Sequence, residues 1–165
     1  MPTEEIFTAP MKWQVNGKVV ATKPLDHSGS LIENFWFEFK DGKVIDFCAE
    51  KEADALKRIL EADEGSCYLG EVALVEHESP ISQSGILFYN TLFDENASCH
   101  LALGAAYPLS VEGGCEMSPE KMAEVGVNDS IKHVDFMFGD ETMCIRGLDQ
   151  DGNETLIFEN GRFVL

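Results

Sequence analysis

The sequence predicts a single β-rich α+β domain, with hairpins and two or three helices packed on the sheet. Short runs of β-branched and aromatic residues recur along the chain, and Asn-Gly or Asp-Gly dipeptides separate several of them. Such dipeptides favour the two-residue turns of β-hairpins. One segment instead has apolar residues at helical spacing. A chain of 165 residues, 44% of them hydrophobic, is long enough to bury one core.

Hairpins are predicted at both ends of the chain. Asn16-Gly17 lies between the apolar runs 13–15 and 19–21, and Asp41-Gly42 separates residues 35–39 from residues 44–47. Asp-Gly and Asn-Gly dipeptides recur in the tail, at 151–152 and 160–161. The aromatic side chains of the first hairpins are expected to pack in the core and on sheet faces; they are Trp13, Phe35, Trp36, Phe37 and Phe39.

Two segments are predicted to be helical. Residues 50–62 carry alanine, leucine and isoleucine at helical spacing among good helix formers, and Gly65 provides a stop. Residues 118–125 form a shorter candidate. There Ser118 is the expected N-cap and Pro119 the first helical residue.

Composition argues against several classes of function. The formal net charge is −18 and no basic patch is present, so binding to the nucleic-acid phosphate backbone is not expected. The five cysteines include no Cys-x-x-Cys pair, which indicates a reducing compartment rather than a disulfide framework or a zinc ribbon. Because no signal peptide and no bilayer-length apolar run is seen, we expect a cytoplasmic protein without a membrane partner.

Charged groups interrupt several apolar, strand-like runs. Glu71 lies inside the run 69–75, and His100 precedes another. His133 and Asp135 are two residues apart, so on a strand they share a face while Val134 points the other way. A buried carboxylate without a partner is costly, and a bound cation is the usual remedy.

The start of the chain adds two acidic residues, Glu4 and Glu5, directly before an extended segment. The residues alone do not choose between these two, because neighbours on a strand face opposite ways. Carboxylates and imidazoles without a thiolate are typical of zinc, manganese or cobalt bound for hydrolysis.

The segment 86–103 is the richest in candidate groups. Asp94, Glu95 and Asn96 are expected to interrupt an apolar strand there. Glu95 has two comparable interpretations, a catalytic base or bridging carboxylate and a capping residue of the following turn. Cys99 is expected to face away from His100 into the core. Two further histidines, His27 and His77, are interpreted as loop residues.

The chain resembles the aminopeptidase T / aminopeptidase S (PepS) family of thermophilic-type metallo-aminopeptidases. Long ordered motifs carry this resemblance through nearly the whole chain; they are residues 2–10, 69–75, 79–82, 87–104 and 133–137. Members of that family are longer. The resemblance therefore implies that residues 1–165 are the C-terminal metal-binding, catalytic domain, and that the family's N-terminal domain is absent.

The resemblance also implies a site. It assigns metal binding to Glu5 rather than Glu4, and it places Tyr107 in the catalytic set. The implied cofactors are two divalent ions (zinc, cobalt or manganese), which activate a water to hydrolyse the N-terminal peptide bond of a peptide with a free amino terminus. A homodimer is implied as well. The expected metal ligands are Glu5, Glu71, His100, His133 and Asp135, and Tyr107 and Glu95 are the expected catalytic residues.

Two alternatives compete with this function. The chain could be a catalytically incompetent metal-binding or oligomerisation fragment of such an enzyme. A mononuclear iron oxygenase is disfavoured, because its two-histidine, one-carboxylate triad usually takes a histidine downstream of the His-x-Asp pair, and no histidine follows His133.

Overall fold

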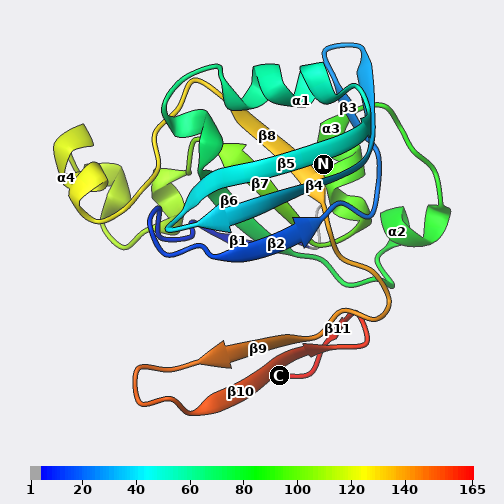
Figure 1. The fold of residues 1–165 in the computed structure, drawn as a ribbon. Helices are drawn as coiled ribbons and strands as arrows, with labels where there is room; N and C mark the ends of the chain where they lie inside the picture. Colours follow the sequence, from blue (N-terminus) through cyan, green and yellow to red (C-terminus); the bar gives the residue numbers. More distant parts are fainter. Residues whose placement is uncertain (1–4) are drawn as a thin grey trace.

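The computed structural model describes residues 5–165, and its strands form three sheets (Figure 1). The first sheet is antiparallel and has the order β1-β6-β7-β8. Its strands are β1 (Ile6–Thr8), β6 (Leu69–Leu74), β7 (His100–Gly104) and β8 (His133–Met137). One face of this sheet carries the candidate functional residues, and the other face packs on the core.

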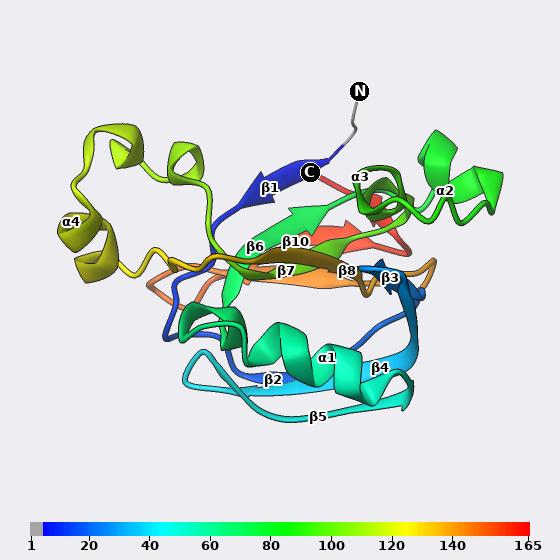
Figure 2. The ribbon, with the colours of Figure 1, turned by 90° about the horizontal axis from the view of Figure 1, so that it is seen from above.

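The second sheet is built around the long strand β4 (Ser30–Lys40). The strands β2 (Gly17–Val20), β3 (Leu25–His27) and β5 (Lys43–Lys51) all pair with it antiparallel. Figure 2 shows this sheet and helix α1 (Ala53–Leu60) on one side of the first sheet.

The core lies between these two sheets. Phe35 and Phe37 of β4 are fully buried, and their rings lie 5.9 and 5.0 Å from that of Phe136 on β8. Helix α1 adds Leu56 and Ile59, also buried. The phenylalanines of β4 therefore fill the core as predicted. Their rings also pack against Phe136 and so support β8 on its core face.

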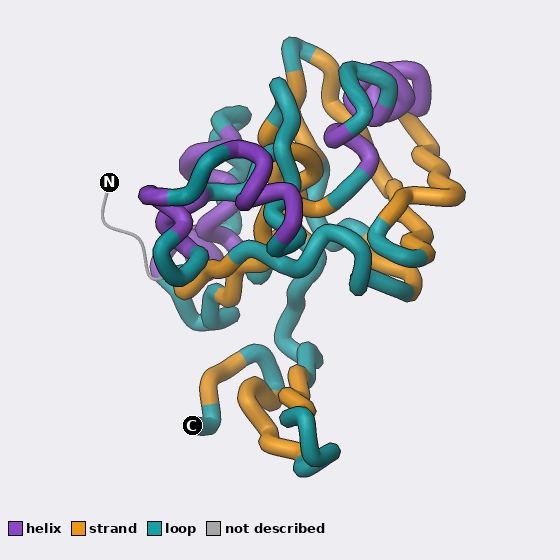
Figure 3. Tube along the Cα trace, turned by 90° about the vertical axis from the view of Figure 1, so that its left-hand side faces the viewer, coloured by secondary structure: helices purple, strands orange, loops and turns teal. Residues whose placement is uncertain are grey.

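The third sheet is a separate C-terminal unit of β9 (Ile145–Leu148), β10 (Glu154–Glu159) and β11 (Arg162–Phe163). It projects from the body of the molecule (Figures 1 and 3). One attachment is the backbone N–H of His77, which donates to the carbonyl of Gly161 at 2.8 Å.

The predicted turns at 41–42 and 160–161 are confirmed. Asp41 and Gly42 have φ angles of 49° and 84°, and Asn160 and Gly161 have φ angles of 50° and 73°. Two successive positive φ angles are what a type I′ hairpin turn requires, and Asn, Asp and Gly adopt them most readily.

The remaining helices are short. They are α2 (Pro80–Ser84), α3 (Thr91–Asp94) and α4 (Pro119–Glu124), with 3-10 turns η1 (Gly65–Cys67), η2 (Glu95–Ala97), η3 (Pro108–Ser110) and η4 (Gly114–Glu116). The expected cap of α4 is confirmed, because Ser118 Oγ accepts the N–H of Lys121 at 3.3 Å. The helix predicted at 50–62 is shorter, since β5 continues to Lys51.

Two details of the first hairpin were predicted wrongly. Residues 13–15 form no strand, and Gly17–Val20 pairs with β4 rather than with the residues before the Asn-Gly dipeptide. The side chain of Trp13 is 50% exposed instead of buried. Local turn chemistry was outweighed here by the longer pairing surface that β4 offers. Within residues 5–165, no helix is long and apolar enough to span a membrane.

Candidate metal centre

Three neighbouring strands of the first sheet bring the charged residues to one face. The register aligns Glu71 of β6 with Ala102 of β7 and Asp135 of β8. His100 lies opposite Ala73 in the same way. Because side chains alternate along a strand, these residues share the face, and the two small alanines leave room above the sheet for the carboxylates and imidazoles.

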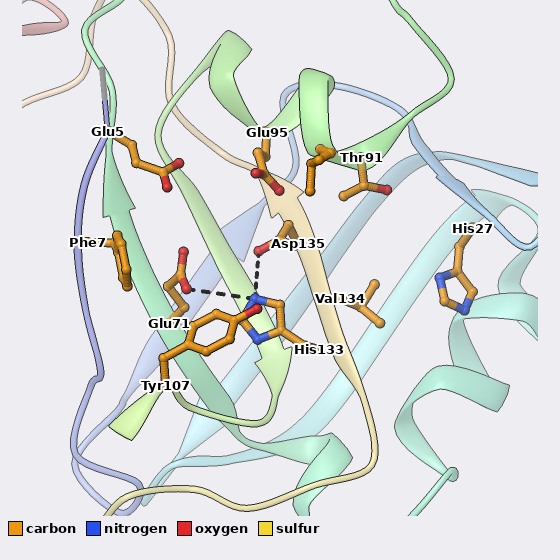
Figure 4. Close-up of a pocket in the computed structure, with 11 residues that line it drawn as sticks. Glu5, Phe7, His27, Glu71, Thr91, Glu95, Tyr107, His133, Val134 and Asp135 are labelled. Carbon is orange, nitrogen blue, oxygen red and sulfur yellow. Dashed lines mark ion pairs between the residues drawn. The ribbon is translucent and has the colours of Figure 1, made fainter. Parts of the chain in front are cut away.

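The ionisable groups are close enough to share a cation. The Nε2 atom of His100 lies 3.4 Å from Oε1 of Glu71 and 3.6 Å from Oε2 of Glu5. The Nε2 atom of His133 lies 3.3 Å from Oδ1 of Asp135 and 3.7 Å from Oε2 of Glu71 (Figure 4). Each oxygen of Glu71 therefore faces a different histidine.

The five predicted ligands are thus brought together. Glu5 comes from the residue before β1, Glu71 from β6, His100 from β7, and His133 and Asp135 from β8. Glu4, the alternative to Glu5, lies outside the described residues.

Both imidazoles are oriented by main-chain carbonyls. The Nδ1–H of His133 donates to the carbonyl of Ala105 at 2.7 Å, and the Nδ1 of His100 lies 3.3 Å from the carbonyl of Ser98. This leaves Nε2 of each ring directed at the carboxylates, which is how metal-ligating histidines are usually held by the groups behind them.

The cluster is buried, and this shapes its protonation. Glu71, His100 and Asp135 are 5%, 1% and 7% exposed. Burial opposes a charged imidazole, but the hydrogen bond and negative charge of Asp135 outweigh it and raise the pKa of His133 to about 9. In the same way, burial is outweighed at His100 by Glu71 and Asp135, so its pKa is raised. Positive charge is therefore strongly favoured here.

The donor set fits a divalent metal ion. Glu71, His100 and Asp135 each offer a ligand atom, and these three atoms lie within 4.8 Å of one another. Imidazole nitrogen and carboxylate oxygen are the ligands of catalytic zinc and related ions. The nearby Cys99 is no competitor, because its thiol contacts the backbone of Val75 in the core, as expected.

A cavity of about 350 Å³ opens over the cluster. Its lining residues are Glu5, Phe7, His27, Glu71, Thr91, Leu92, Glu95, Tyr107, His133, Val134 and Asp135 (Figure 4). Both predicted catalytic residues, Tyr107 and Glu95, are therefore at the wall. A small molecule or the end of a peptide fits a volume of this size.

Tyr107 and Glu95 face the cluster from opposite walls. The Tyr107 ring lies 4.7 Å from that of His133, and burial together with the charge of Asp135 raises the pKa of its hydroxyl. Burial and the same aspartate raise the pKa of Glu95 to about 7. Tyr107 is thus a hydroxyl donor at neutral pH, while Glu95 can gain or lose a proton.

The expected strand around residues 94–96 is wrong. Thr91–Asp94 is helix α3, and Glu95–Ala97 is the 3-10 turn η2. Asn90 caps the helix by accepting the N–H of Leu92. The Asp94 carboxylate accepts the backbone N–H groups of Phe88 and Asn90 at 2.7 and 3.0 Å, so it holds the loop instead of joining the cavity.

Sequence reasoning missed several wall residues. His27 ends β3 and lines the cavity, so its interpretation as a loop residue is wrong, whereas His77 does lie in a turn. Burial lowers the pKa of His27. Phe7 pairs with Ala73 and so lies on the same sheet face as the cluster. The alternation of side chains along residues 5–8 would have placed Phe7 on the same face as Glu5. No local sequence pattern indicates that Thr91 or Leu92 lines the cavity.

Comparisons with known proteins agree with this geometry. The family described as thermophilic metalloprotease (M29) matches residues 1–163. Aminopeptidase AmpS of Bacillus subtilis (strain 168) is 57% identical over 164 residues, which cover 99% of this chain and 40% of the relative. Aminopeptidase T of Thermus aquaticus is 44% identical over the whole chain and 40% of its own length.

A solved structure gives the same answer for the fold. Wild-type AmpT from Thermus thermophilus superposes with a TM-score of 0.93 at 44% sequence identity, over 99% of this chain and 40% of that one. The chain thus spans about 40% of the length of the relatives it matches. Because the family matches residues 1–163 and the chain buries a cluster of nitrogen and oxygen ligands, this chain belongs to the thermophilic metalloprotease (M29) family.

Proposed function

We propose that the chain is the metal-binding, catalytic domain of a metallo-aminopeptidase, which hydrolyses the N-terminal peptide bond of peptides with a free amino terminus. The observation that carries this is Glu71, whose two oxygens lie near His100 and His133 respectively. A carboxylate between two imidazoles is suited to bridge two ions. The M29 membership and the names of the relatives supply the reaction class.

Five residues would hold the divalent ions; they are Glu5, Glu71, His100, His133 and Asp135. Glu71 lies near both histidines. Zinc, cobalt and manganese all suit these donors. When bound, such ions supply Lewis acidity toward the scissile carbonyl and lower the pKa of water.

The chain's own residues would perform the remaining steps. Glu95 accepts a proton from water and passes it to the leaving amine, a task for which a pKa near the working pH is best. The Tyr107 hydroxyl stays protonated and donates a hydrogen bond to the carbonyl oxygen as negative charge develops there. Carboxylates not neutralised by the ions receive the substrate's ammonium group, which favours an amino-terminal substrate.

Metal content per chain is the first test. The protein is purified without chelator and reloaded with zinc, cobalt or manganese; we expect close to two ions per chain. The double variant Glu71→Ala/His100→Ala should lose them. Glu112→Ala, which removes an exposed carboxylate outside the cavity, is the matched control and should bind as the wild type does.

A peptide-hydrolysis assay distinguishes an active aminopeptidase domain from a catalytically incompetent metal-binding fragment. A loaded chain that cleaves a free dipeptide but not its N-acetylated form supports the aminopeptidase. Two bound ions without any cleavage would favour the incompetent fragment instead. No stoichiometric metal under any loading condition would contradict the proposed function and would leave the chain as a scaffold part of a longer enzyme. The homodimer and the cytoplasmic location stay predictions, and the strongly acidic composition supports the absence of a nucleic-acid partner.

A further inference from the structure

β8 is the edge strand of the first sheet, and it carries two of the candidate ligands. Among the described residues it pairs only with β7. The backbone N–H of Ala105 donates to the carbonyl of Lys132, and the N–H of Phe138 donates to that of Cys99. Antiparallel hydrogen bonds recur every second residue. The even-numbered residues of β8 therefore bond to β7, and the odd-numbered ones direct their N–H and C=O groups away from it.

Met137 confirms this direction and closes one end of the edge. Its carbonyl accepts the backbone N–H of Thr22 at 2.9 Å, so it points to the segment before β3 and not to β7. The Thr22 hydroxyl also donates to the carbonyl of Gly139 at 2.9 Å. An extended chain lying along β8 could not continue past this point.

Asp135 is the next residue whose backbone groups point away from β7. Unlike Met137, it has no hydrogen-bond partner on that side among the described residues. Within residues 5–165, no protein group forms a hydrogen bond with its N–H or C=O. The cavity over the cluster is lined by Val134 and Asp135 and also by His27 of β3, so it reaches this side of β8. Unpaired strand edges bind other extended chains readily.

We propose that the free edge of β8 binds the main chain of the peptide substrate as an added antiparallel strand, with the backbone of Asp135 exchanging two hydrogen bonds with one substrate residue. This rests on the function proposed above and adds the substrate class, an extended peptide rather than a single amino-acid amide. Thr22 acts as the stop for the amino terminus.

The arrangement of charges fits this direction. Glu5 and Glu95 lie on one side of the cluster, and His133 and Tyr107 lie on the other (Figure 4). By register His100, which faces Glu5, is level with Met137, the closed end of the edge. The amino terminus of the substrate would thus lie at the closed end, on the side of Glu5 and Glu95, and the chain would leave past Tyr107, which is 46% exposed.

Amide hydrogen exchange on the full chain tests the edge directly. The probe is tetra-alanine whose first peptide bond is reduced to CH2–NH, so that it cannot be cleaved there. We expect the Asp135 amide to exchange at least tenfold more slowly when the probe is bound. The amides of Val134 and Phe136, already bonded to β7, are internal controls and should not change.

Modified probes provide the matched control. The same peptide N-methylated at its third or fourth residue loses one N–H donor, and one of these analogues should bind about tenfold more weakly. Probe binding that leaves the Asp135 amide unprotected would overturn the edge proposal even if the loaded chain hydrolyses peptides. Protection of Asp135 in a loaded chain that hydrolyses nothing would retain the edge and overturn the aminopeptidase function.

Discussion

The carbonyl of Ala105 lies 2.7 Å from Nδ1 of His133 and sets the direction in which Nε2 of that ring points. The carbonyl is held by the backbone around it. Gly104 donates its N–H to the carbonyl of Tyr68, and Asn128 donates to the carbonyl of Gly104. The orientation of the candidate ligand His133 therefore depends on the close approach of the β6 backbone to the end of β7.

Gly70 permits that approach, so Gly70→Ala should weaken metal binding. A Cβ at residue 70 would lie 2.2 Å from the carbonyl oxygen of Ala105, which must then move away from His133. Loss of such a supporting hydrogen bond typically lowers metal affinity about ten- to a hundredfold. Competition with a zinc indicator measures the affinity, and the ring 15N shifts of His133 report its orientation.

The control for this variant is Gly152→Ala. Gly152 has a positive φ angle, which Gly70 does not, but its added Cβ meets nothing within 4 Å and the residue lies in the C-terminal hairpin. It should lose some stability and keep its metal affinity. Unchanged zinc affinity and unchanged His133 shifts in Gly70→Ala would contradict the positioning argument.

Glu95→Gln should keep both metals but lose turnover. Glu95 lines the cavity opposite Tyr107, outside the five-residue ligand set, and a glutamine preserves its shape. Removing a general base typically lowers kcat by about 10²- to 10⁴-fold. A parallel loss of metal would show instead that Glu95 is a ligand.

The same residue predicts a pH dependence for the loaded enzyme. A base must be ionised, so activity should rise with pH through the pKa of Glu95, about 7 without metal. Bound cations favour the carboxylate, so the rising limb lies at or below that pH. Initial rates between pH 5 and 9 measure it, and the residual activity of Glu95→Gln should lack this limb.

Much of the site could be predicted because strand alternation is a local rule. His133 and Asp135 project together and Val134 lies on the other face, as a period of two requires. The ligand set also depended on resemblance, since nothing local distinguishes Glu5 from Glu4. The wall residues on α3 could not be predicted, because a one-turn helix has too few residues to show a period.

The first hairpin shows the opposite case. Asn16-Gly17 favours a tight turn, yet β4 is eleven residues long and offers its edge to β2. β2 pairs with β4 along all four of its residues, and such long-range competition is invisible in a window of a few residues.

In the metal-free protein, stability should fall as pH rises. The pKa of His133 is about 9 in the folded state and 6.5 in the absence of partners. Its contribution is therefore fully present below pH 6.5 and is lost as pH rises through 9, a difference of about 3 kcal/mol. Glu95 acts in the same direction, because the folded state raises its pKa as well. Urea unfolding with chelator at pH 6, 7.5 and 9 measures the trend.

Metal should reverse this trend, since it competes with the proton for His133 and binds better as pH rises. The variant His133→Asn should unfold with a flatter pH profile in chelator. A metal-free wild type with equal unfolding midpoints at pH 6 and pH 9 would contradict the proposed charge balance of the cluster.

Asp63 ties the loop before β8 to the rest of the domain, so Asp63→Asn should destabilise the chain. One oxygen accepts the N–H and hydroxyl of Ser66 and the hydroxyl of Ser130, and the other accepts the N–H of Ile131 at 2.6 Å. Burial opposes ionisation, but these hydrogen bonds outweigh it and lower the pKa of Asp63 to about 2. An asparagine NH2 cannot accept from Ile131, which should cost about 1 kcal/mol at a partly exposed site.

The pH profile identifies the carboxylate as the cause. Because the folded pKa is below the unfolded value of 3.8, Asp63 stabilises the fold above pH 3.8 and this stabilisation is lost as pH falls through about 2. The gap between wild type and Asp63→Asn in urea should therefore be full at pH 7 and narrow near pH 2. Asp54→Asn, on the exposed side of α1, should change stability by only a few tenths of a kcal/mol. A gap of constant size from pH 7 to pH 2 would mean that shape, not charge, makes residue 63 important. In that case the loop before His133 would be held by Ser66 and Ser130 without a contribution from the charge of Asp63.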